Sequence, residues 1–525
     1  MTLGKAPSEQ DIFRSSTDFC SGRLSPTSVY GLLHRECHRL FPDESFADLF
    51  DDIGRASVPP RLVSVVMVLQ RLEGLSDREA VERFAFDLRW KYAAGGLDFD
   101  HPGFVHTVLV DMRARLRRSE RPDRIFEKAL EVAQSAGLIG RKRVLDSTAL
   151  YDAVATQDTV TLIRSAIRTL LRTVDEPLAA ELRTALKRDD DYVAAGKPVC
   201  DWEDVAAREA LVDALARDAQ GVLLRLDGRE LSVEVKQAAA LVATVVGQDL
   251  EQREDGLFRI ARRVAPDRVI STVDPEARHG HKTASRSFDG YKGHIAVDPD
   301  SEIIVQTEVT SGNVADGAMT EKLLSDVLKN EPEANRAAGI EAYGDSSYGT
   351  APVVEKLEAA GIEPNVKMQA PSARNGMYSK EDFAIDTEAQ TVRCPAGHTV
   401  EFASSADGGG LAKFGSLCDG CPLRAQCTGS KDGRTISVHP REPTLQRTRA
   451  AQSDPSWKAK YRATRPKVER KFGHLMRRKH GGRRARVRGC ERIGQDFALL
   501  AAATNLKRLA TLGVYHSEQG WARQA

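Results

Sequence analysis

Two aspartates in the sequence stand where they could share a divalent cation. Asp146 closes the short apolar run that starts at Arg141, and Asp345 closes a second run that starts at Ile340. Both runs have the length and composition of a strand, so each aspartate is predicted at the C-terminal end of one. In an open α/β sheet, ligands bind at that edge. If the two strands are neighbours, their carboxylates can hold one metal site.

A third acid, Glu469, lies on a predicted helix that starts at Pro466. Val468, Phe472 and Leu475 form an apolar stripe on this helix, and a rotation of ~100° per residue puts Glu469 beside the stripe. A lone acid in a basic segment is ordinarily a surface ion-pair partner. It is also the group that would hold a divalent cation beside bound phosphate. Two aspartates and one glutamate form an all-oxygen ligand set that suits Mg²⁺ or Mn²⁺.

Other acids near the same predicted strands are alternative ligands, namely Asp274, Asp298, Glu308 and Asp316. If Glu469 is only a surface residue, Glu308 and Asp316 are the first alternatives for the third metal ligand.

The basic residues are distributed unevenly. The chain has 76 Lys and Arg against 75 Asp and Glu, a net charge of +1. Between Trp457 and Arg488, however, fourteen Lys and Arg accompany one acid. From Arg441 to the end, 21 basic and six acidic residues give about +15, which leaves about −14 for the rest of the chain. Such a segment implies a polyanionic partner, and the alternative is a solvated helical face or tail; charge alone does not choose between DNA, RNA and a membrane.

Four of the eight cysteines lie within 34 residues, at positions Cys394, Cys418, Cys421 and Cys427. Four thiolates can bind one Zn²⁺ tetrahedrally and so stabilise a Gly-rich segment with little apolar content. His398 could replace one thiol, and the alternative is a loop that merely carries cysteines. The other four cysteines, Cys20, Cys37, Cys200 and Cys490, are scattered and expected to be inert.

These residues must be positioned by a mixed α/β sheet. The sequence predicts a first strand from Arg141, a hairpin of 290–297 and 302–310, and strands at 340–345 and 362–368, with helices at 315–329 and 351–360 between them. The mostly helical residues from about 155 to 262 would be an insertion between the first strand and the hairpin, and packing alone explains them.

The segment from Ser28 to about Arg118 is predicted to be helical. One helix follows Pro59-Pro60 and ends at Gly74, and a capping box from Ser76 to Glu79 starts a second helix that is expected to run to Gly95. A third helix is expected over 104–118 and ends in four arginines, Arg113, Arg115, Arg117 and Arg118. Three short helices suit a helix-turn-helix DNA binder and any small helical bundle equally well.

Length and composition bound the class of protein. The 525 residues suggest two to four structural units, and 41% apolar with 29% charged residues is ordinary for a globular chain. No stretch approaches ~18 apolar residues, which argues against a membrane-spanning helix. The first fourteen residues lack the apolar core of a secretory signal, so we expect a cytoplasmic protein with reduced thiols.

In their order, the motifs resemble those of bacterial insertion-sequence transposases of the DDE class. The segments 54–60 and 74–79 look like parts of the N-terminal helical domain of these enzymes, and 274–313 looks like their central hairpin. The segments 145–148 and 343–349 look like their two aspartate strands, and 465–469 looks like their glutamate helix. Three positions depart from the family pattern. Tyr461 is one residue too far from Arg465, Met476 stands where a base is expected, and Ser147 replaces a glycine.

The resemblance implies a ribonuclease-H-like catalytic domain, with Asp146, Asp345 and Glu469 as catalytic ligands of Mg²⁺ (or Mn²⁺). It implies the following organisation: an N-terminal tail, 1–27; a helical DNA-binding domain, 28–135; the catalytic domain, 136–390 and 440–515, with an insertion at about 150–265; a cysteine-rich probable zinc insert, 391–439; and a C-terminal tail, 516–525.

The activity implied is metal-dependent cleavage and transfer of DNA strands at the ends of an insertion sequence. Double-stranded DNA, both the terminal inverted repeats and the target, would be the partner of a possible homodimer, and no membrane is involved. The residues expected to contact phosphates are Arg465, Lys467, Arg470, Lys471, Arg477, Arg478, Lys479, Arg483 and Arg484. Two alternatives are a non-catalytic DNA-binding descendant of a transposase and an endonuclease of the same fold without strand transfer.

Overall fold

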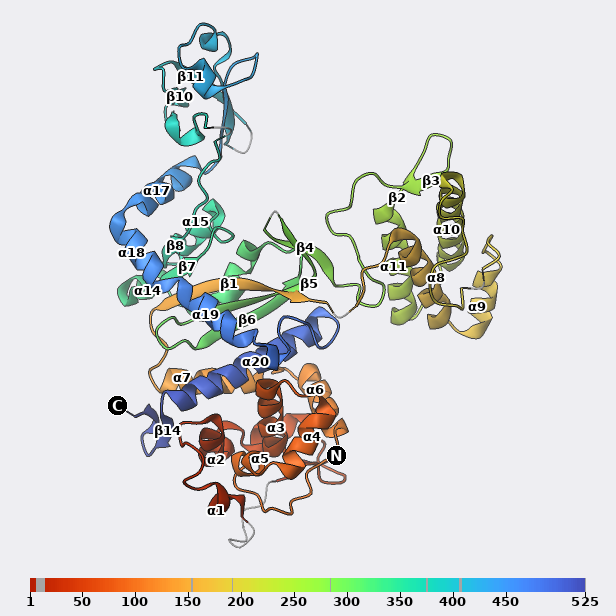
Figure 1. The fold of residues 1–525 in the computed structure, drawn as a ribbon, viewed down its shortest axis with the longest axis vertical. Coiled ribbons are helices and arrows are strands. Elements are labelled where there is room, and N and C mark those ends of the chain that lie inside the picture. The colour runs from red at the N-terminus through yellow and green to blue at the C-terminus, as the bar shows by residue number, and fades with distance from the viewer. Residues whose placement is uncertain are drawn as a thin grey trace.

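The computed structural model describes residues 1–5, 15–152, 154–190, 192–283, 285–373, 376–405 and 408–524. A mixed sheet lies at the centre of the molecule (Figure 1). Its strands are β1 (Lys142–Tyr151), β4 (Arg278–Thr283), β5 (Arg286–Val297), β6 (Ile304–Ser311), β7 (Glu341–Gly344) and β8 (Glu363–Val366). The order is β4-β5-β1-β7-β8, and β6 also pairs with β5. The predicted mixed α/β architecture is confirmed.

Strand directions follow from the connections. The tight turn at 298–301 makes β5 and β6 an antiparallel hairpin, and β1 is antiparallel to β5. By contrast, β1, β7 and β8 are mutually parallel neighbours because helical segments connect β6 to β7 and β7 to β8. The first of these connections was predicted as one helix over 315–329. It is instead divided into η2 (Asp316–Met319), α12 (Thr320–Leu323), α13 (Ser325–Leu328) and α14 (Pro332–Ala338), whereas α15 (Ala351–Ala359) is a single helix as predicted.

Each face of the sheet is covered by helices. Alternate residues of β1 point to opposite faces, so Val144 enters one core and Leu145 the other. The core with Leu145 includes α12, α13 and α15. The core with Val144 includes α19 (Pro466–Leu475) and the long helix α20 (Cys490–Thr511).

The N-terminal segment is helical, as predicted. It contains α1 (Ser16–Cys20), α2 (Val29–Leu40), η1 (Asp43–Leu49), α3 (Pro60–Glu73), α4 (Asp77–Phe86), α5 (Leu88–Ala93), α6 (Thr107–Arg118) and α7 (Arg124–Ser135). Gly74 ends α3 with φ of 71°, and the capping box of Ser76 and Glu79 starts α4. The second predicted helix is broken, however. Asp87 is extended and its carboxylate accepts from Arg89 N, which ends α4 and starts α5.

These N-terminal helices share their core with the end of the chain. Leu69 of α3, Val132 of α7 and Leu506 of α20 belong to one buried cluster, which continues to the central sheet. Figure 1 shows α20 lying between the N-terminal helices and the sheet. The helices therefore depend on α20 for their burial.

The insertion between β1 and β4 has a core of its own. It consists of α8 (Thr159–Thr173), α9 (Glu176–Arg183), α10 (Val205–Leu226), α11 (Val233–Asp249) and the hairpin of β2 (Leu250–Gln252) and β3 (Phe258–Ile260), which the sequence did not predict. Its two ends meet, because Gln157 N donates to the carbonyl of Ile270 and its side chain accepts from Thr272 N.

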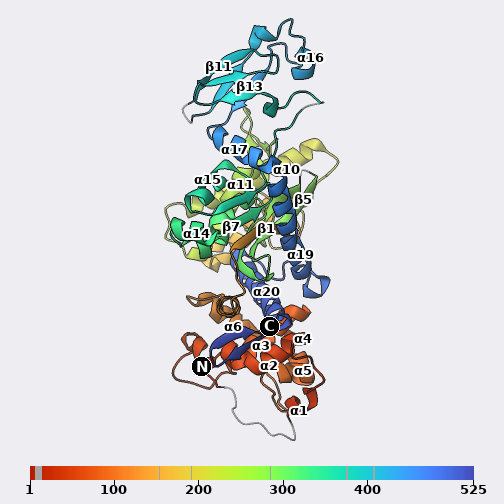
Figure 2. The ribbon, with the colours of Figure 1, turned by 90° about the vertical axis from the view of Figure 1, so that its left-hand side faces the viewer.

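The cysteine-rich segment forms a separate antiparallel sheet of five strands, seen at the top of Figures 1 and 2. Its strands are β9 (Ala384–Asp386), β10 (Thr391–Arg393), β11 (Thr399–Ser404), β12 (Gly410–Lys413) and β13 (Thr435–Val438). The short helices η3 (Lys380–Asp382), η4 (Gly415–Cys418) and α16 (Arg424–Cys427) belong to the same region, and α17 (Glu442–Ser453) and α18 (Pro455–Thr464) lead back to the central sheet.

Both predicted tails contain secondary structure. Ser15 caps α1 within 1–27, although residues 6–14 lie outside the described residues. At the other end, β14 (Val514–Ser517) and β15 (Gly520–Arg523) form a hairpin, in which Val514 is buried against the main core. Short apolar anchors of this kind are too small to give a periodic signal in the sequence.

Within the described residues, no helix is both long and apolar enough to cross a bilayer.

Candidate active site and basic surface

Asp146 lies in the middle of β1, not at its end as predicted. Parallel pairing of β1 with β7 ends at Val144 opposite Tyr343, but pairing with β5 continues to Tyr151. The prediction ended the strand where the apolar run stops, but the later residues of β1 remain in the strand by pairing with β5 alone. Since Asp146 is two residues after Val144, its side chain lies on the face covered by α19.

Asp345 follows the last residue of β7. The register that pairs Val144 with Tyr343 places Asp345 beside Asp146 on neighbouring parallel strands. Asp345 Oδ1 accepts from Ser347 N, which fixes the turn after the strand. The two predicted strands are therefore neighbours in the sheet, as a shared site requires.

The guanidinium of Arg465 lies among all three acids. Its Nη2 is 3.1 Å from Asp146 Oδ1 and 3.7 Å from Asp345 Oδ2, and its Nη1 is 3.6 Å from Glu469 Oε1. The Arg465 side chain is 7% exposed, and its Nε and Nη1 have no hydrogen-bond partner among the described residues. One cation therefore already occupies the point on which three carboxylates converge.

Glu469 approaches from the first turn of α19. Val468, Phe472 and Leu475 are buried as predicted, and the Glu469 side chain is 66% exposed. Pro466, which cannot donate a backbone N–H, separates α18 from α19 at Arg465. This break carries Arg465 inward and leaves Glu469 at the rim.

Tyr461 contributes to the same site despite its shifted position in the sequence. Its hydroxyl donates to the carbonyl of Gly344 at 3.1 Å, directly before Asp345. The register with Arg465 is maintained because Arg465 N donates to Tyr461 O. The tyrosine thus ties α18 to the end of β7.

Burial controls the protonation of Asp146. Loss of solvent raises the pKa of its carboxyl to about 6, against the opposing effects of Arg465 and of the backbone N–H of Ser147. The same ion pairs raise the pKa of Arg465, although burial opposes them. A cation beside Asp146 is therefore needed to keep this carboxylate charged near neutral pH.

Among the described residues, no group of three or more His, Cys, Asp or Glu side chains has an arrangement that could hold a metal ion. The three acids instead each lie within 3.7 Å of the Arg465 guanidinium. Their oxygen donors nevertheless fit Mg²⁺ or Mn²⁺ in kind, since they already face a common positive charge.

The alternative acids have structural partners. Asp298 accepts from Ser301 N and Gly140 N and so closes the β5–β6 turn, and Asp274 accepts from the hydroxyl of Tyr291. Asp316 pairs with Lys292 at 2.9 Å and accepts from Ser147 Oγ at 2.7 Å. Ser147, the departure from the family pattern, points to the opposite face of β1 from Asp146.

Glu308, the remaining alternative, is 3.6 Å from the ammonium of Lys322.

Two comparisons with protein families identify the chain. A family model described as "Transposase DDE domain" matches residues 393–510, and a model described as "Transposase domain (DUF772)" matches residues 31–115. The protein is a DDE-domain transposase. The first match includes Glu469 and Arg465, while Asp146 and Asp345 lie outside both matched ranges. No curated protein and no solved structure matches the chain.

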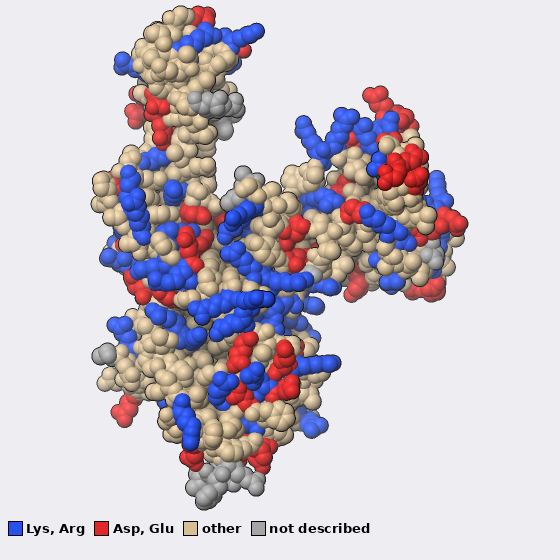
Figure 3. All heavy atoms as spheres, viewed as in Figure 1, with Lys and Arg blue, Asp and Glu red and all other residues tan. Residues whose placement is uncertain are grey.

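A band of Lys and Arg crosses the transposase over the region of α19 and the start of α20 (Figures 1 and 3). Several of the predicted DNA contacts are exposed there and make no ion pair with a described acid, namely Arg477, Arg478, Lys479 and Arg484, with Arg483 half-buried. Two others are neutralised, since Lys467 pairs with Asp300 at 2.9 Å and Arg470 pairs with Glu302.

The last two predicted contacts, Arg465 and Lys471, are buried. Their side chains point between α19 and its neighbours rather than to the surface. The apolar stripe of α19 predicted which side of the helix faces the core, and Lys471 lies beside that stripe, but the charge pattern alone placed it on the surface.

The four clustered cysteines of the transposase face one small cavity, which His398 also lines. Cys418 and Cys427 are 9% and 8% exposed, and Arg434 N donates to Cys418 Sγ at 3.4 Å. Burial raises the pKa of Cys427, and the other three thiols raise it further. All eight cysteines are free thiols.

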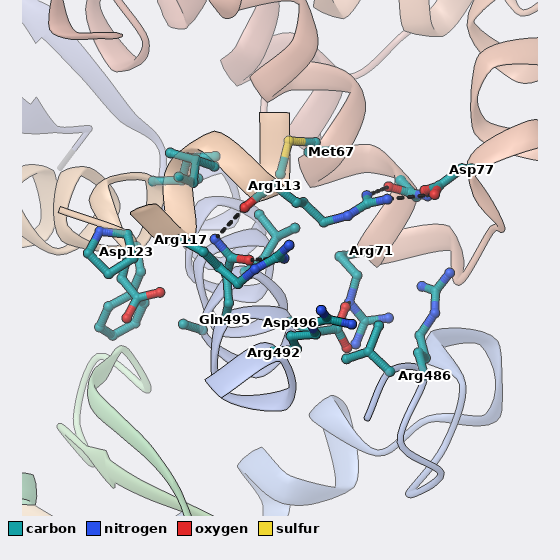
Figure 4. A pocket seen from close by; sticks show the side chains of 18 of the residues that line it. Met67, Arg71, Asp77, Arg113, Arg117, Asp123, Arg486, Arg492, Gln495 and Asp496 are labelled. Carbon is teal, nitrogen blue, oxygen red and sulfur yellow. Dashed lines mark hydrogen bonds and ion pairs between the residues drawn. The ribbon is translucent and has the colours of Figure 1, made fainter. Parts of the chain in front are cut away.

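The basic end of α6 is turned inward. Figure 4 shows Arg113 and Arg117 in a cavity of about 240 Å³ between the N-terminal helices and α20. Arg113 pairs with Asp77, and Arg117 donates to Gln495 Oε1 at 3.2 Å. Arg115 donates to the carbonyl of Leu49. Three of the four arginines that suggested a DNA-binding helix therefore hold the transposase together.

Proposed function

We propose that this transposase cleaves and rejoins DNA strands at the ends of an insertion sequence, with Asp146, Asp345 and Glu469 as the catalytic acids. The observation that carries the proposal is the convergence of the three carboxylates on the Arg465 guanidinium. The two family matches support the reaction class, since a DDE-domain transposase acts on DNA and enzymes of this type generally use a divalent metal.

We infer that the sheet is ribonuclease-H-like. The path β6-β5-β1-β7-β8 supports this inference, with an antiparallel β6-β5-β1 meander followed by two parallel strands. In such a sheet the first aspartate belongs on the central strand and the second on its parallel neighbour. The catalytic domain would comprise 136–373 and 440–515, interrupted by the insertion and by the cysteine-rich segment. That segment begins before the predicted residue 391, because β9 pairs with β10 of the cysteine-rich sheet.

Asp146, Asp345 and Glu469 would hold Mg²⁺ or Mn²⁺, which supplies a Lewis acid for an attacking water and for the leaving 3′ oxygen. Arg465 keeps the buried Asp146 ionised until the acids are needed and is itself a donor for a phosphate oxygen if it turns outward. Tyr461 holds the end of β7 and thus the position of Asp345. No covalent bond to the protein is required.

The exposed residues Arg477, Arg478, Lys479, Arg483 and Arg484 would neutralise the phosphates of double-stranded DNA, both the terminal inverted repeats and the target. This role is supported because none of them makes an ion pair with an acid that the structure describes. Each phosphate neutralised releases counterions, so affinity should fall steeply with salt. Action on paired ends would involve a homodimer.

We propose that Cys394, Cys418, Cys421 and Cys427 bind a structural Zn²⁺. In the described structure the four thiols are not arranged as a set of metal ligands, so binding would draw them together. Their common cavity supports the site, and the small core around them supports the need for it.

The acid trio is tested with Asp345→Asn and Glu469→Gln. Both changes keep the shape but remove a charge, and both sites are exposed enough to tolerate this, with side chains 41% and 66% exposed. DNA binding should persist, whereas cleavage of duplexes with the element's ends in Mg²⁺ should fall by several orders of magnitude. Glu308→Gln is the matched control. Normal cleavage by the Glu469→Gln variant would transfer the role to another acid.

A further inference from the structure

A second basic cavity, of about 150 Å³, lies on the other side of α19 from Glu469. Lys471 is two residues after Glu469 and thus ~200° around the helix. The cavity is bounded by α19, η5 (Arg478–His480), α20 and the end of α3. Its polar lining includes Lys471, Arg477, His480, Thr504, Lys507 and Arg508.

Positive charge in this cavity exceeds negative charge. Four cations line it, and Glu302, the one acid in the lining, pairs with Arg470. Lys471, Arg477 and Lys507 make no ion pair with a described acid. Burial lowers the pKa of Lys507, and repulsion from Lys479 and Arg477 lowers it further. The folded chain therefore carries a repulsion that an anion in the cavity would remove.

Hydrogen-bonding groups in the cavity are also left without partners. The Thr504 hydroxyl and His480 Nε2 are buried and make no hydrogen bond with a described residue. Thr504 is 8% exposed, His480 5% and Lys471 1%, and Lys471 has no hydrogen-bond partner within the described chain. A buried polar group without a partner costs ~1–3 kcal/mol, so the Thr504 hydroxyl calls for a ligand that accepts from it. His480 Nε2 can donate to such a ligand only when the imidazole is protonated, because Nδ1 donates to the carbonyl of Leu475 at 3.2 Å.

We propose that this cavity is a binding site for one phosphate group. A tetrahedral oxyanion offers several acceptors to the Lys471 ammonium, the Thr504 hydroxyl and the arginines at once. A volume equal to about five waters, at ~30 Å³ each, admits the group with some solvent. The phosphate is either free in solution or part of a DNA backbone, and only in the second case does the proposal rest on the proposed function.

The test is a calorimetric titration of the full-length protein with inorganic phosphate, at an ionic strength held constant with NaCl. We expect saturable binding at one site, weakened about 10- to 100-fold by Lys471→Met, which removes one charged hydrogen bond. Lys467→Met is the control, because Lys467 lies on the same helix, pairs with Asp300 and does not line the cavity. If Lys471→Met fails to fold, Lys507→Gln replaces it.

Absence of saturable phosphate binding would overturn the site, as would an equal loss in the Lys467→Met control. Affinity for duplex DNA then separates the two sources. If inorganic phosphate competes with duplex DNA for the wild type but not for Lys471→Met, the site holds a phosphate of the DNA backbone. If Lys471→Met binds duplex DNA with unchanged affinity, the site holds free phosphate. The titration needs neither metal nor cleavage, so its failure would leave the three-acid proposal intact.

Discussion

At the scale of single residues, Arg465 explains how three acids can be gathered without unfolding the chain. Asp146 is mostly buried, and an unpaired carboxylate there would be costly. The guanidinium reduces this cost and brings Asp345 and Glu469 to the same point. It competes with any metal for the acids, which makes its removal informative.

Arg465→Met should lower the free energy of unfolding by about 2–3 kcal/mol without metal. This is less than the ~3–5 kcal/mol expected for a fully buried pair, because Asp345 and Glu469 are partly exposed. Mg²⁺ should then raise the melting temperature of the variant more than that of the wild type. Thermal unfolding with EDTA and with Mg²⁺ measures both effects. Equal Mg²⁺ stabilisation of the two proteins would show that the acids do not hold the ion.

Asp123 offers a pH test of the seam between the N-terminal helices and α20. Burial, with repulsion from Glu127 and Glu308, raises the pKa of its carboxyl to about 6 (Figure 4). An acid whose pKa is raised in the folded state costs stability above that pKa, and the cost disappears below its unfolded value, ~3.9. Asp123→Asn should therefore stabilise the protein by about 1–2 kcal/mol at pH 7.5 and hardly at all at pH 4.

Urea unfolding at the two pH values measures this difference, with the exposed Asp111→Asn as control. A gain of the same size at both pH values would contradict the titration of Asp123.

At the scale of elements, the positions of the acids depend on where strands and helices stop pairing. β1 is a continuous strand, yet only its first residues pair with β7, and Asp146 lies where that pairing ends. The Pro466 break between α18 and α19 has a similar effect, since it separates an inward arginine from an outward glutamate by one turn. Among the described residues, the cysteine-rich sheet has the smallest buried core, nine residues that include two cysteines.

Purified protein should therefore contain about one zinc per chain, and the double change Cys418→Ser and Cys421→Ser should remove it. Cys200→Ser, a cysteine outside the cavity, should not. Metal analysis and limited proteolysis between 376 and 440 measure the loss of metal and of local order. Zinc-free protein under reducing conditions, with unchanged resistance to protease, would refute the site.

At the scale of the whole molecule, some buried cores form within one segment of the chain and others need a distant segment. The insertion has a cluster that includes Ile163, Leu215 and Val242, and its ends meet at Gln157 and Ile270. The N-terminal helices, in contrast, complete their core with Leu506 and Leu509 of α20, more than 350 residues away in sequence. Only the first arrangement meets the requirement of a unit that folds alone.

Residues 155–272 expressed alone should give a cooperative helical melt, whereas residues 1–139 alone should not. Adding residues 488–524 to the second fragment should restore cooperative unfolding, as judged by circular dichroism. A cooperative melt of 1–139 alone would show that α20 is dispensable for these helices.

The sequence by itself determined most of the elements. The capping box at Ser76, the stop at Gly74, the β5–β6 hairpin and the amphipathic α19 were predicted because local preferences and periodicity decide them. The sequence also placed the three acids in the correct types of element, and it indicated the transposase family that the comparisons support.

Only the tertiary structure decided which side chains meet. The Arg465 guanidinium among the acids, the burial of Lys471 and the inward arginines of α6 all depend on contacts between segments far apart in sequence. Charge patterns predict a basic surface but not which cations are turned inside, since burial is set by packing against α20 and the sheet. Periodicity is a local signal, and these contacts are not local.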